Sequence, residues 1–164
     1  MLEALIQQDW ETIFWTIFWS STFIGETKIG IPYALYNDMP IVSAYFIACT
    51  SNMLAFPVTM WFLDFVHKRF ANSHFYNKYF NQYLQATRKK TIGLITKYGY
   101  LGILIFVMFP VPMTGAYVGS VACWLFDMDR KKSFVAVSIG AFIAGAILVI
   151  LYEAGLIAFE AVSE

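Results

Sequence analysis

Two charged residues stand inside an otherwise apolar stretch near the start of the chain. Glu26 and Lys28 interrupt residues 10–37, which are rich in Phe, Trp, Ile and Tyr. A charge near the centre of a bilayer costs about 2.5–3.5 kcal/mol on insertion scales, so intramembrane charges usually belong to an ion or substrate pathway. Glu26 could therefore carry a proton, while Lys28 tunes its proton affinity or binds an anion. The alternative is a mutually neutralising pair that only fixes a turn.

Helix-breaking residues provide a second kind of chemistry. Gly25 through Pro32 interrupt the first apolar stretch. Because Pro favours the first position of a helix, Pro32 and Pro112 each predict the start of a returning half-helix. The unpaired N–H groups and the dipole of such a helix start form a weak anion site.

The second apolar stretch, residues 99–126, is broken by Pro110-Val111-Pro112 and the residues that follow. Thr114 offers a hydroxyl beside the predicted anion site, and Gly115 permits close approach of the backbone. We therefore expect the two breaks to form one site for a substrate that carries a carboxylate or a phosphate.

The composition indicates which elements position these residues. The chain of 164 residues is 59% hydrophobic and 13% charged, with a mean hydropathy of +0.60. Soluble domains carry about 25% charged residues, so an all-α integral membrane protein of one domain is expected. Residues 41–66 and 133–152 have the length of plain transmembrane helices. Pro57 should kink the first of them, because its ring clashes with the backbone one turn back.

The distribution of charge predicts the topology. Basic residues gather in the turn at 130–132 and in a central segment that contains Lys68, Arg69, Lys78, Arg88, Lys89, Lys90 and Lys97. The N-terminal region, the turn at 37–40 and the C-terminal region carry acids and no Lys or Arg. The positive-inside rule then places the central segment and the 127–132 turn in the cytoplasm, and both termini outside a multi-pass cell membrane protein.

Each broken stretch begins and ends on one side of the membrane under this rule, so neither can span it. We predict two re-entrant helical hairpins, at 10–37 and 99–126, that enter from opposite faces. Each precedes a transmembrane helix, which gives an inverted repeat of the kind found in secondary transporters. The alternative for each stretch is one long, tilted, Pro-kinked helix.

The segment at 67–98 is expected to join the halves as an amphipathic helix at the cytoplasmic interface. Its basic residues would face anionic headgroups, and aromatic residues recur on it at helical spacing: Phe75, Tyr76, Tyr79, Phe80 and Tyr83. Binding of nucleic acid by this segment is disfavoured beside so much membrane-embedded chain.

Other polar residues leave alternatives open. Asn52 lies in the middle of the first transmembrane helix and could satisfy a hairpin tip or line a cavity. Asp64 with His67 and Lys68 favours an interfacial ion cluster over a metal site. The sequence has no Cys/His cluster, phosphate loop or serine elbow, so no enzyme activity, cofactor or metal is predicted.

Small residues recur four positions apart on the last helix, at Ala136, Gly140 and Ala144, and begin the returning arm at Gly115 and Gly119. Such spacing lets helix backbones approach closely, either within one chain or between two copies. Because two spans and two hairpins bury little surface, this favours a homodimer.

Three segments together resemble the putative small multidrug export protein family. They are Glu26-Thr27-Lys28-Ile29-Gly30-Ile31-Pro32, Ser51-Asn52-Met53-Leu54-Ala55-Phe56-Pro57 and Phe109-Pro110-Val111-Pro112-Met113-Thr114-Gly115-Ala116-Tyr117. The family patterns are E-x-R-G-x-I-P, G-N-x-x-x-x-P and P-x-P-x-T-G-A-[WY], in the same order. Here Lys28 replaces an Arg, and Ile29 and Ser51 each replace a Gly.

The resemblance implies a functional set of Glu26, Pro32, Asn52, Pro110, Pro112, Thr114 and Gly115. It also implies a distant similarity to the DedA membrane proteins, which have two re-entrant hairpins and move lipids or lipid carriers. No arginine stands in the second tip, where a DedA protein has one.

These observations favour a secondary transporter coupled to H+ or Na+, moving a small anionic or drug-like substrate between the two tips. The alternatives are a flippase or scramblase for a phosphorylated lipid, and a membrane scaffold that transports nothing. Membrane lipids surround the protein in each case.

Overall fold

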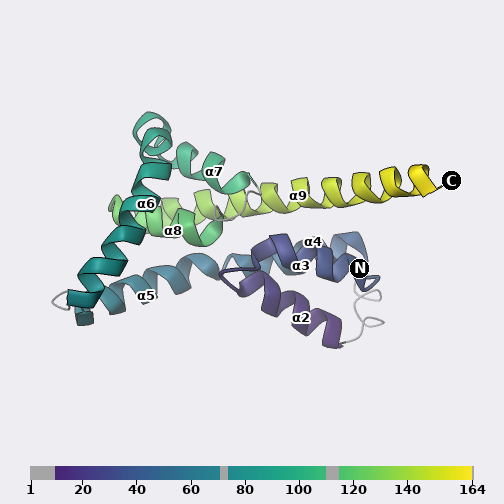
Figure 1. Ribbon diagram of the computed structural model, residues 1–164, viewed down its shortest axis with the longest axis horizontal. Helices are drawn as coiled ribbons and strands as arrows, with labels where there is room; N and C mark the ends of the chain where they lie inside the picture. Colours follow the sequence, from purple (N-terminus) through teal and green to yellow (C-terminus); the bar gives the residue numbers. More distant parts are fainter. Residues whose placement is uncertain (1–9, 71–73, 110–114, 164) are drawn as a thin grey trace.

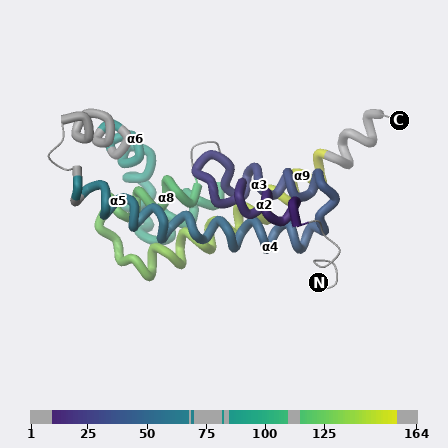
Figure 2. The backbone as a smooth tube through the Cα atoms, turned by 90° about the horizontal axis from the view of Figure 1, so that it is seen from below, coloured from purple at the N-terminus to yellow at the C-terminus, as the bar shows by residue number. Residues whose placement is uncertain are grey.

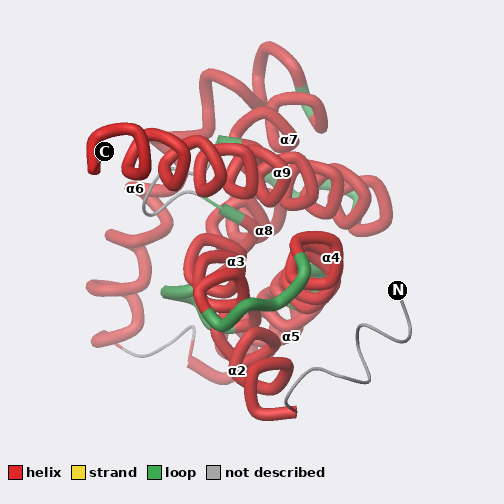
Figure 3. The backbone as a smooth tube through the Cα atoms, turned by 90° about the vertical axis from the view of Figure 1, so that its right-hand side faces the viewer, coloured by secondary structure: helices red, strands yellow, loops and turns green. Residues whose placement is uncertain are grey.

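Helices form all the regular structure in the described part of the chain, residues 10–70, 74–109 and 115–163 of a computed structural model (Figure 3). In chain order they are α2 (Trp10–Ser21), α3 (Glu26–Tyr36), α4 (Ile41–Asn52), α5 (Ala55–Phe70), α6 (His74–Tyr98), α7 (Tyr100–Met108), α8 (Ala116–Leu125) and α9 (Arg130–Ser163).

Each predicted hairpin segment forms two helices and not one long kinked helix. α2 and α3 form a first helix pair, and α7 and α8 form a second helix pair. Figure 1 shows the first pair extending toward one end of the long axis and the second toward the other, so that the end of α2 and the end of α7 both lie near the middle of the molecule.

The turn of the first pair lies earlier than predicted. Residues 22–25 form it, α3 begins at Glu26, and Pro32 lies in the interior of α3. The prediction that Pro32 opens the returning helix is therefore wrong. The physical reason is Thr22, whose hydroxyl donates to the Trp19 carbonyl and accepts the Gly25 N–H, at 2.9 and 3.1 Å. These bonds close the turn before the helix reaches Pro32.

Two segments are long and apolar enough to cross a membrane, Ile41–His67 and Arg130–Gly155. The first comprises α4 and most of α5, which are separated at Met53 and Leu54. The break lies one turn before Pro57, where the ring of a proline collides with the preceding backbone. The predicted kink is confirmed, whereas α9 runs without interruption.

The returning helices pack against both long segments. α3 contacts α2, α4 and α9, an arrangement visible end-on in Figure 3, and α8 contacts α5, α6 and α9. The main cluster of buried apolar side chains lies between α5, α7, α8 and α9, and a smaller one includes Ala34, Met39 and Ala44. The two helix pairs are thus held in one helical bundle.

The buried face of α2 is polar, and its exposed face is apolar. The buried residues of α2 are Thr12, Thr16 and Ser20, four positions apart, whereas its exposed face carries Trp10, Phe14 and Phe18. In water this arrangement would expose large apolar groups and bury polar ones. It suits a helix whose outer face contacts lipid and whose small polar face contacts a neighbouring helix.

The same turn follows both returning helices. The Met39 N–H donates to the Ala34 carbonyl, and the Met128 N–H donates to the Cys123 carbonyl, each at 3.0 Å. An aspartate with a left-handed backbone precedes each methionine, with φ of 57° at Asp38 and 49° at Asp127. Both turns are Schellman motifs, which satisfy the free carbonyls at a helix end.

The segment between the halves is helical, as predicted. α6 lies at one end of the molecule and runs across the direction of the long helices, as Figures 1 and 2 show. Its predicted aromatic face, from Phe75 to Tyr83, falls on side chains outside those that the structure describes.

Candidate functional site: a carboxylate between the two helix pairs

The two helix pairs meet at Glu26. Its side chain is 7% exposed, and its Oε1 accepts the backbone N–H of Tyr117, near the start of α8, at 3.2 Å. The backbone N–H of Ala116 also interacts with this carboxylate. Its Oε2 lies 3.2 Å from Nζ of Lys28. The carboxylate therefore bridges a lysine of its own helix and the first turn of a helix from the other pair.

The backbone at Glu26 explains why it can pair with a residue only two positions away. Residues two apart on a regular helix do not face each other. Glu26 has a φ of 48°, in the left-handed region, although it is the first residue of α3. A non-glycine residue held there costs about 1–3 kcal/mol and persists only where surrounding contacts impose it. Such strained positions are concentrated at functional sites.

Glu26 occupies the anion site that the sequence predicts at the second returning helix. No side-chain hydrogen bond caps α8 at its N-cap residue, Gly115, and the Glu26 carboxylate supplies the negative charge that the helix dipole favours there. A Cβ atom at Gly115 would lie 2.0 Å from Oε2 of Glu26, so only glycine leaves room for this approach. The negative charge at the start of α8 therefore comes from the protein's own carboxylate.

Tyr117 is a site residue that the sequence analysis did not select. Its hydroxyl donates to the carbonyl of Ser21 at the end of α2, and its ring meets that of Phe23 edge-on with centroids 5.4 Å apart. Backbone and side chain of one residue therefore hold both sides of the turn between α2 and α3. The signal was present, because Tyr117 is the aromatic residue that ends the third motif.

The other predicted site residues do not all join the contact at Glu26. Asn52 is buried at 2% exposure, and its Oδ1 has no hydrogen-bond partner. Pro32 is half-buried within α3 and contributes no helix start. Pro110, Pro112 and Thr114 lie outside the described residues. The structure thus brings together Glu26, Lys28 and Gly115.

A cavity of about 400 Å3 adjoins this contact on the side of α5. Tyr117 lines it together with Phe23 from the turn of the first pair, Thr59 and Phe62 from α5, and Val121 from α8. The hydroxyl of Thr59 is buried without a hydrogen-bond partner. A mainly apolar cavity, with the unsatisfied hydroxyl of Thr59 in its lining, therefore lies next to Tyr117, which donates to the Glu26 carboxylate.

A second polar cluster fastens α5 to α8 and α9. Asp64 accepts hydrogen bonds from Nε1 of Trp124 at 3.0 Å and from Nη2 of Arg130 at 2.8 Å, and the His67 ring meets that of Trp124 edge-on. The sequence predicts a local cluster of Asp64, His67 and Lys68. The structure adds contacts between three helices, which the local pattern could not indicate.

The small residues of α9 serve packing within the chain. A Cβ at Gly140 would lie 2.9 Å from the Leu104 carbonyl of α7, and one at Gly145 would lie 2.5 Å from Sγ of Cys49 on α4. Of the two alternatives for this stripe, intramolecular packing is what these positions show. The homodimer stays a prediction.

Two helices of spanning length and the large apolar side chains exposed on the outer faces are typical of an integral membrane protein. A family comparison narrows this class. Residues 26–147 match the family described as putative small multi-drug export protein, and the chain belongs to that family. The matched region begins at Glu26 and contains all three motifs. No curated protein and no solved structure matches the chain significantly.

Proposed function

We propose that this protein is a secondary transporter, driven by H+ or Na+, whose coupling group is Glu26. The observation that carries the proposal is the position of its carboxylate, buried between Lys28 and the start of α8. A transporter of this kind needs a charge that is satisfied in one state and can be neutralised in another. The family description, which names export proteins, supports the same function.

The contact has two states that differ in charge. Ionised, Glu26 holds the two helix pairs together through Lys28 and the N–H groups of α8. Protonation, or coordination of Na+, weakens both interactions and lets the pairs separate. Lys28 and the α8 N–H groups then become available to an anionic group of the substrate, and the cavity beside Tyr117 accepts its apolar part. Binding of the coupling ion to Glu26 would thus free the donors that the anionic group of the substrate needs.

The proposal includes re-entrant hairpins in an inverted repeat, with α6 and the Arg130 turn in the cytoplasm. The opposite directions of the two helix pairs along the long axis support it (Figure 1). So do the matched Schellman turns at Asp38 and Asp127, because each connects a returning helix to a long helix at the same place in its half. Alternating access would then be a rocking of one helix pair against the other.

A flux assay in proteoliposomes tests this function. The purified protein is reconstituted with a pH gradient, and uptake is measured for two probes, ethidium as a drug-like cation and lactate as a small anion. Glu26→Gln should abolish the pH-driven uptake that the wild-type chain catalyses, because the amide cannot release a proton. Asp38→Asn is the matched control, since it also neutralises a carboxylate but lies in an exposed turn and Asn tolerates its left-handed backbone.

Two outcomes would contradict the proposal. One is a Glu26→Gln protein that folds and retains the wild-type uptake rate. The other is a wild-type chain that moves neither probe in response to the gradient.

A further inference from the structure

An apolar groove runs along the first half of α9. Its first part is a hollow of about 520 Å3, lined by Phe56, Pro57 and Trp61 of α5 and by Phe134 and Val135 of α9, with Arg130 and Lys131 at its end. A second hollow of about 570 Å3 shares Phe134 and Val135 and continues along α9 toward α4. The two form one apolar groove whose charged residues, Asp64, Arg130 and Lys131, lie at one end.

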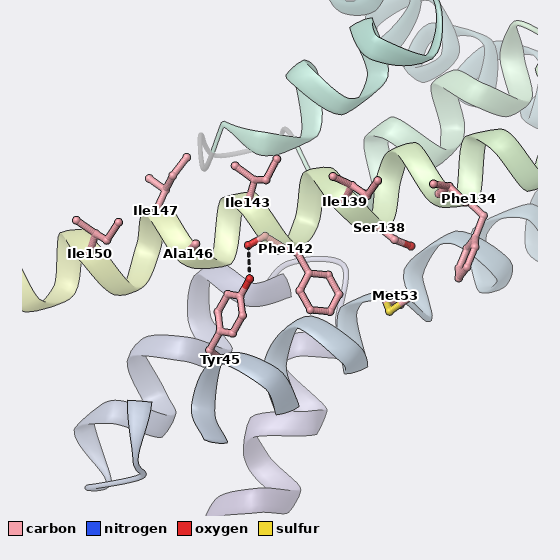
Figure 4. Close-up of a pocket in the computed structure, with 11 residues that line it drawn as sticks. Tyr45, Met53, Phe134, Ser138, Ile139, Phe142, Ile143, Ala146, Ile147 and Ile150 are labelled. Atoms are coloured by element: carbon pink, nitrogen blue, oxygen red, sulfur yellow. Dashed lines mark hydrogen bonds between the residues drawn. The ribbon is translucent and has the colours of Figure 1, made fainter. Parts of the chain in front are cut away.

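Figure 4 shows the second hollow. Phe134, Ser138 and Phe142 point from α9 toward Met53 and Tyr45, and the Tyr45 hydroxyl donates to the Phe142 carbonyl at 3.0 Å. That bond holds α4 against α9. The lining continues to Ile150, so from Lys131 the helix rises about 28 Å at 1.5 Å per residue, which is more than one leaflet of a hydrocarbon core about 30 Å thick. The groove is long enough for one acyl chain.

The basic end of the groove has an unusual electrostatic environment. Arg130, Lys131 and Lys132 form the first turn of α9, where the helix dipole disfavours positive charge. Asp129 offsets part of this unfavourable charge by accepting the backbone N–H of Lys132 at 2.9 Å, and Asp64 pairs with Arg130. The Lys132 ammonium lies over the Tyr100 ring. Within the described residues, Lys131 has no carboxylate at salt-bridge distance. An anion at this helix start would be stabilised by the dipole and by Lys131 together.

We propose that this groove binds an anionic phospholipid, with its phosphate at Lys131 and Arg130 and one acyl chain along Phe134, Val135 and Phe142. Charge complementarity favours an anionic headgroup, because Arg130 and Lys131 together outweigh the one carboxylate at this end, Asp64. The long apolar lining of the groove suits the acyl chain of a lipid. Basic pockets between transmembrane helices bind such headgroups in the same way. The site faces lipid between α5 and α9, apart from the Glu26 contact, so it does not depend on the transport proposal.

Native mass spectrometry of the detergent-purified protein tests this site. The wild-type chain is titrated with phosphatidylglycerol and, separately, with phosphatidylcholine of the same acyl chains. We expect tighter binding of phosphatidylglycerol, and a loss of about five-fold in that affinity for Lys131→Gln, the effect of one basic residue beside an anionic lipid. Lys89→Gln, an equal charge change at an exposed residue of α6, is the control and should bind as the wild-type chain does.

A second variant separates the groove from the headgroup site. Val135 is exposed and lines both hollows, so Val135→Trp fills the groove and leaves every basic residue in place. It should weaken phosphatidylglycerol binding while the melting temperature of the lipid-free protein stays unchanged. Equal affinity for the two lipids, or unchanged phosphatidylglycerol binding by both variants, would overturn the proposal. Probe uptake in the flux assay is scored independently, so failure of one proposal is distinguishable from failure of the other.

Discussion

The two helix pairs have the same architecture but contribute opposite charges to the contact between them. The first pair supplies a carboxylate, Glu26, from a turn that Thr22 closes with two hydrogen bonds. The second pair supplies the start of α8, whose N-cap residue, Gly115, offers no side chain. The first pair therefore carries the ionisable group, and the second carries the fixed dipole.

In the proposed inverted repeat, this difference gives the ionisable group to one half and the helix dipole to the other. Two identical turns would repel each other if both carried a carboxylate, and would leave both helix starts uncapped if neither did. Glu26 accepts a hydrogen bond from the start of α8, and the ammonium of Lys28 balances the rest of its negative charge. The exit turns at Asp38 and Asp127, by contrast, have matching left-handed backbones.

The largest effect on stability should come from Lys28. Lys28→Gln leaves the Glu26 carboxylate buried without its ammonium partner, and removing one member of a buried ion pair costs about 3–5 kcal/mol. Thermal unfolding in detergent should show a markedly lower midpoint, which the additional change Glu26→Gln should largely restore. Lys97→Gln on α6 is the exposed control. If Lys28→Gln unfolded at the wild-type midpoint, the ion pair of Glu26 and Lys28 would not stabilise the first helix pair.

A smaller loss is expected at the second link between the halves. Asp64→Ala removes hydrogen bonds from Trp124 and Arg130, and bonds to a charged group contribute about 1.5–3 kcal/mol. Asp64→Asn, which can still accept from Trp124, should lose less in the same unfolding measurement. Equal losses for the two variants would mean that the Arg130 and Trp124 contacts do not stabilise the fold as described.

The smallest effect should be a gain, and it should be equal in the two halves. Asp38→Gly and Asp127→Gly each relieve a left-handed backbone, which disfavours residues with a Cβ, and each should stabilise by up to about 1 kcal/mol. Asp129→Ala, which removes the cap of α9, should instead destabilise by about 1 kcal/mol. A gain in one half and a loss in the other would show that the two turns are not equivalent.

The sequence predicted those features that local physics determines. Apolar length located the two spanning segments, and Pro57 located the break between α4 and α5. The two apolar stretches with polar interruptions became two helix pairs. Proline preference failed at Pro32, because the hydroxyl of Thr22 closes the turn earlier and periodicity carries no information about that bond.

The contact between Glu26 and the start of α8 could be predicted from the sequence only in part. Glu26 and Gly115 were both selected as candidates, but Glu26 and its hydrogen-bond donor Tyr117 lie 91 positions apart in the chain. No local pattern pairs residues at such a separation. The left-handed backbone of Glu26, which directs its carboxylate toward both Lys28 and α8, is likewise a consequence of tertiary packing.

Disulfide formation between the two turns tests the central claim, that the helix pairs meet at Glu26. With Cys49 and Cys123 replaced by alanine, Glu26→Cys and Gly115→Cys are introduced together and oxidised in native membranes. A Cβ built at Gly115 would lie 2.6 Å from Cδ of Glu26, which places the two positions close together, so the account predicts formation of an intramolecular disulfide. Glu26→Cys combined with Asp127→Cys, in the exposed exit turn of the second pair, should form none. Absence of the first disulfide, with both thiols reactive toward a small reagent, would contradict the account.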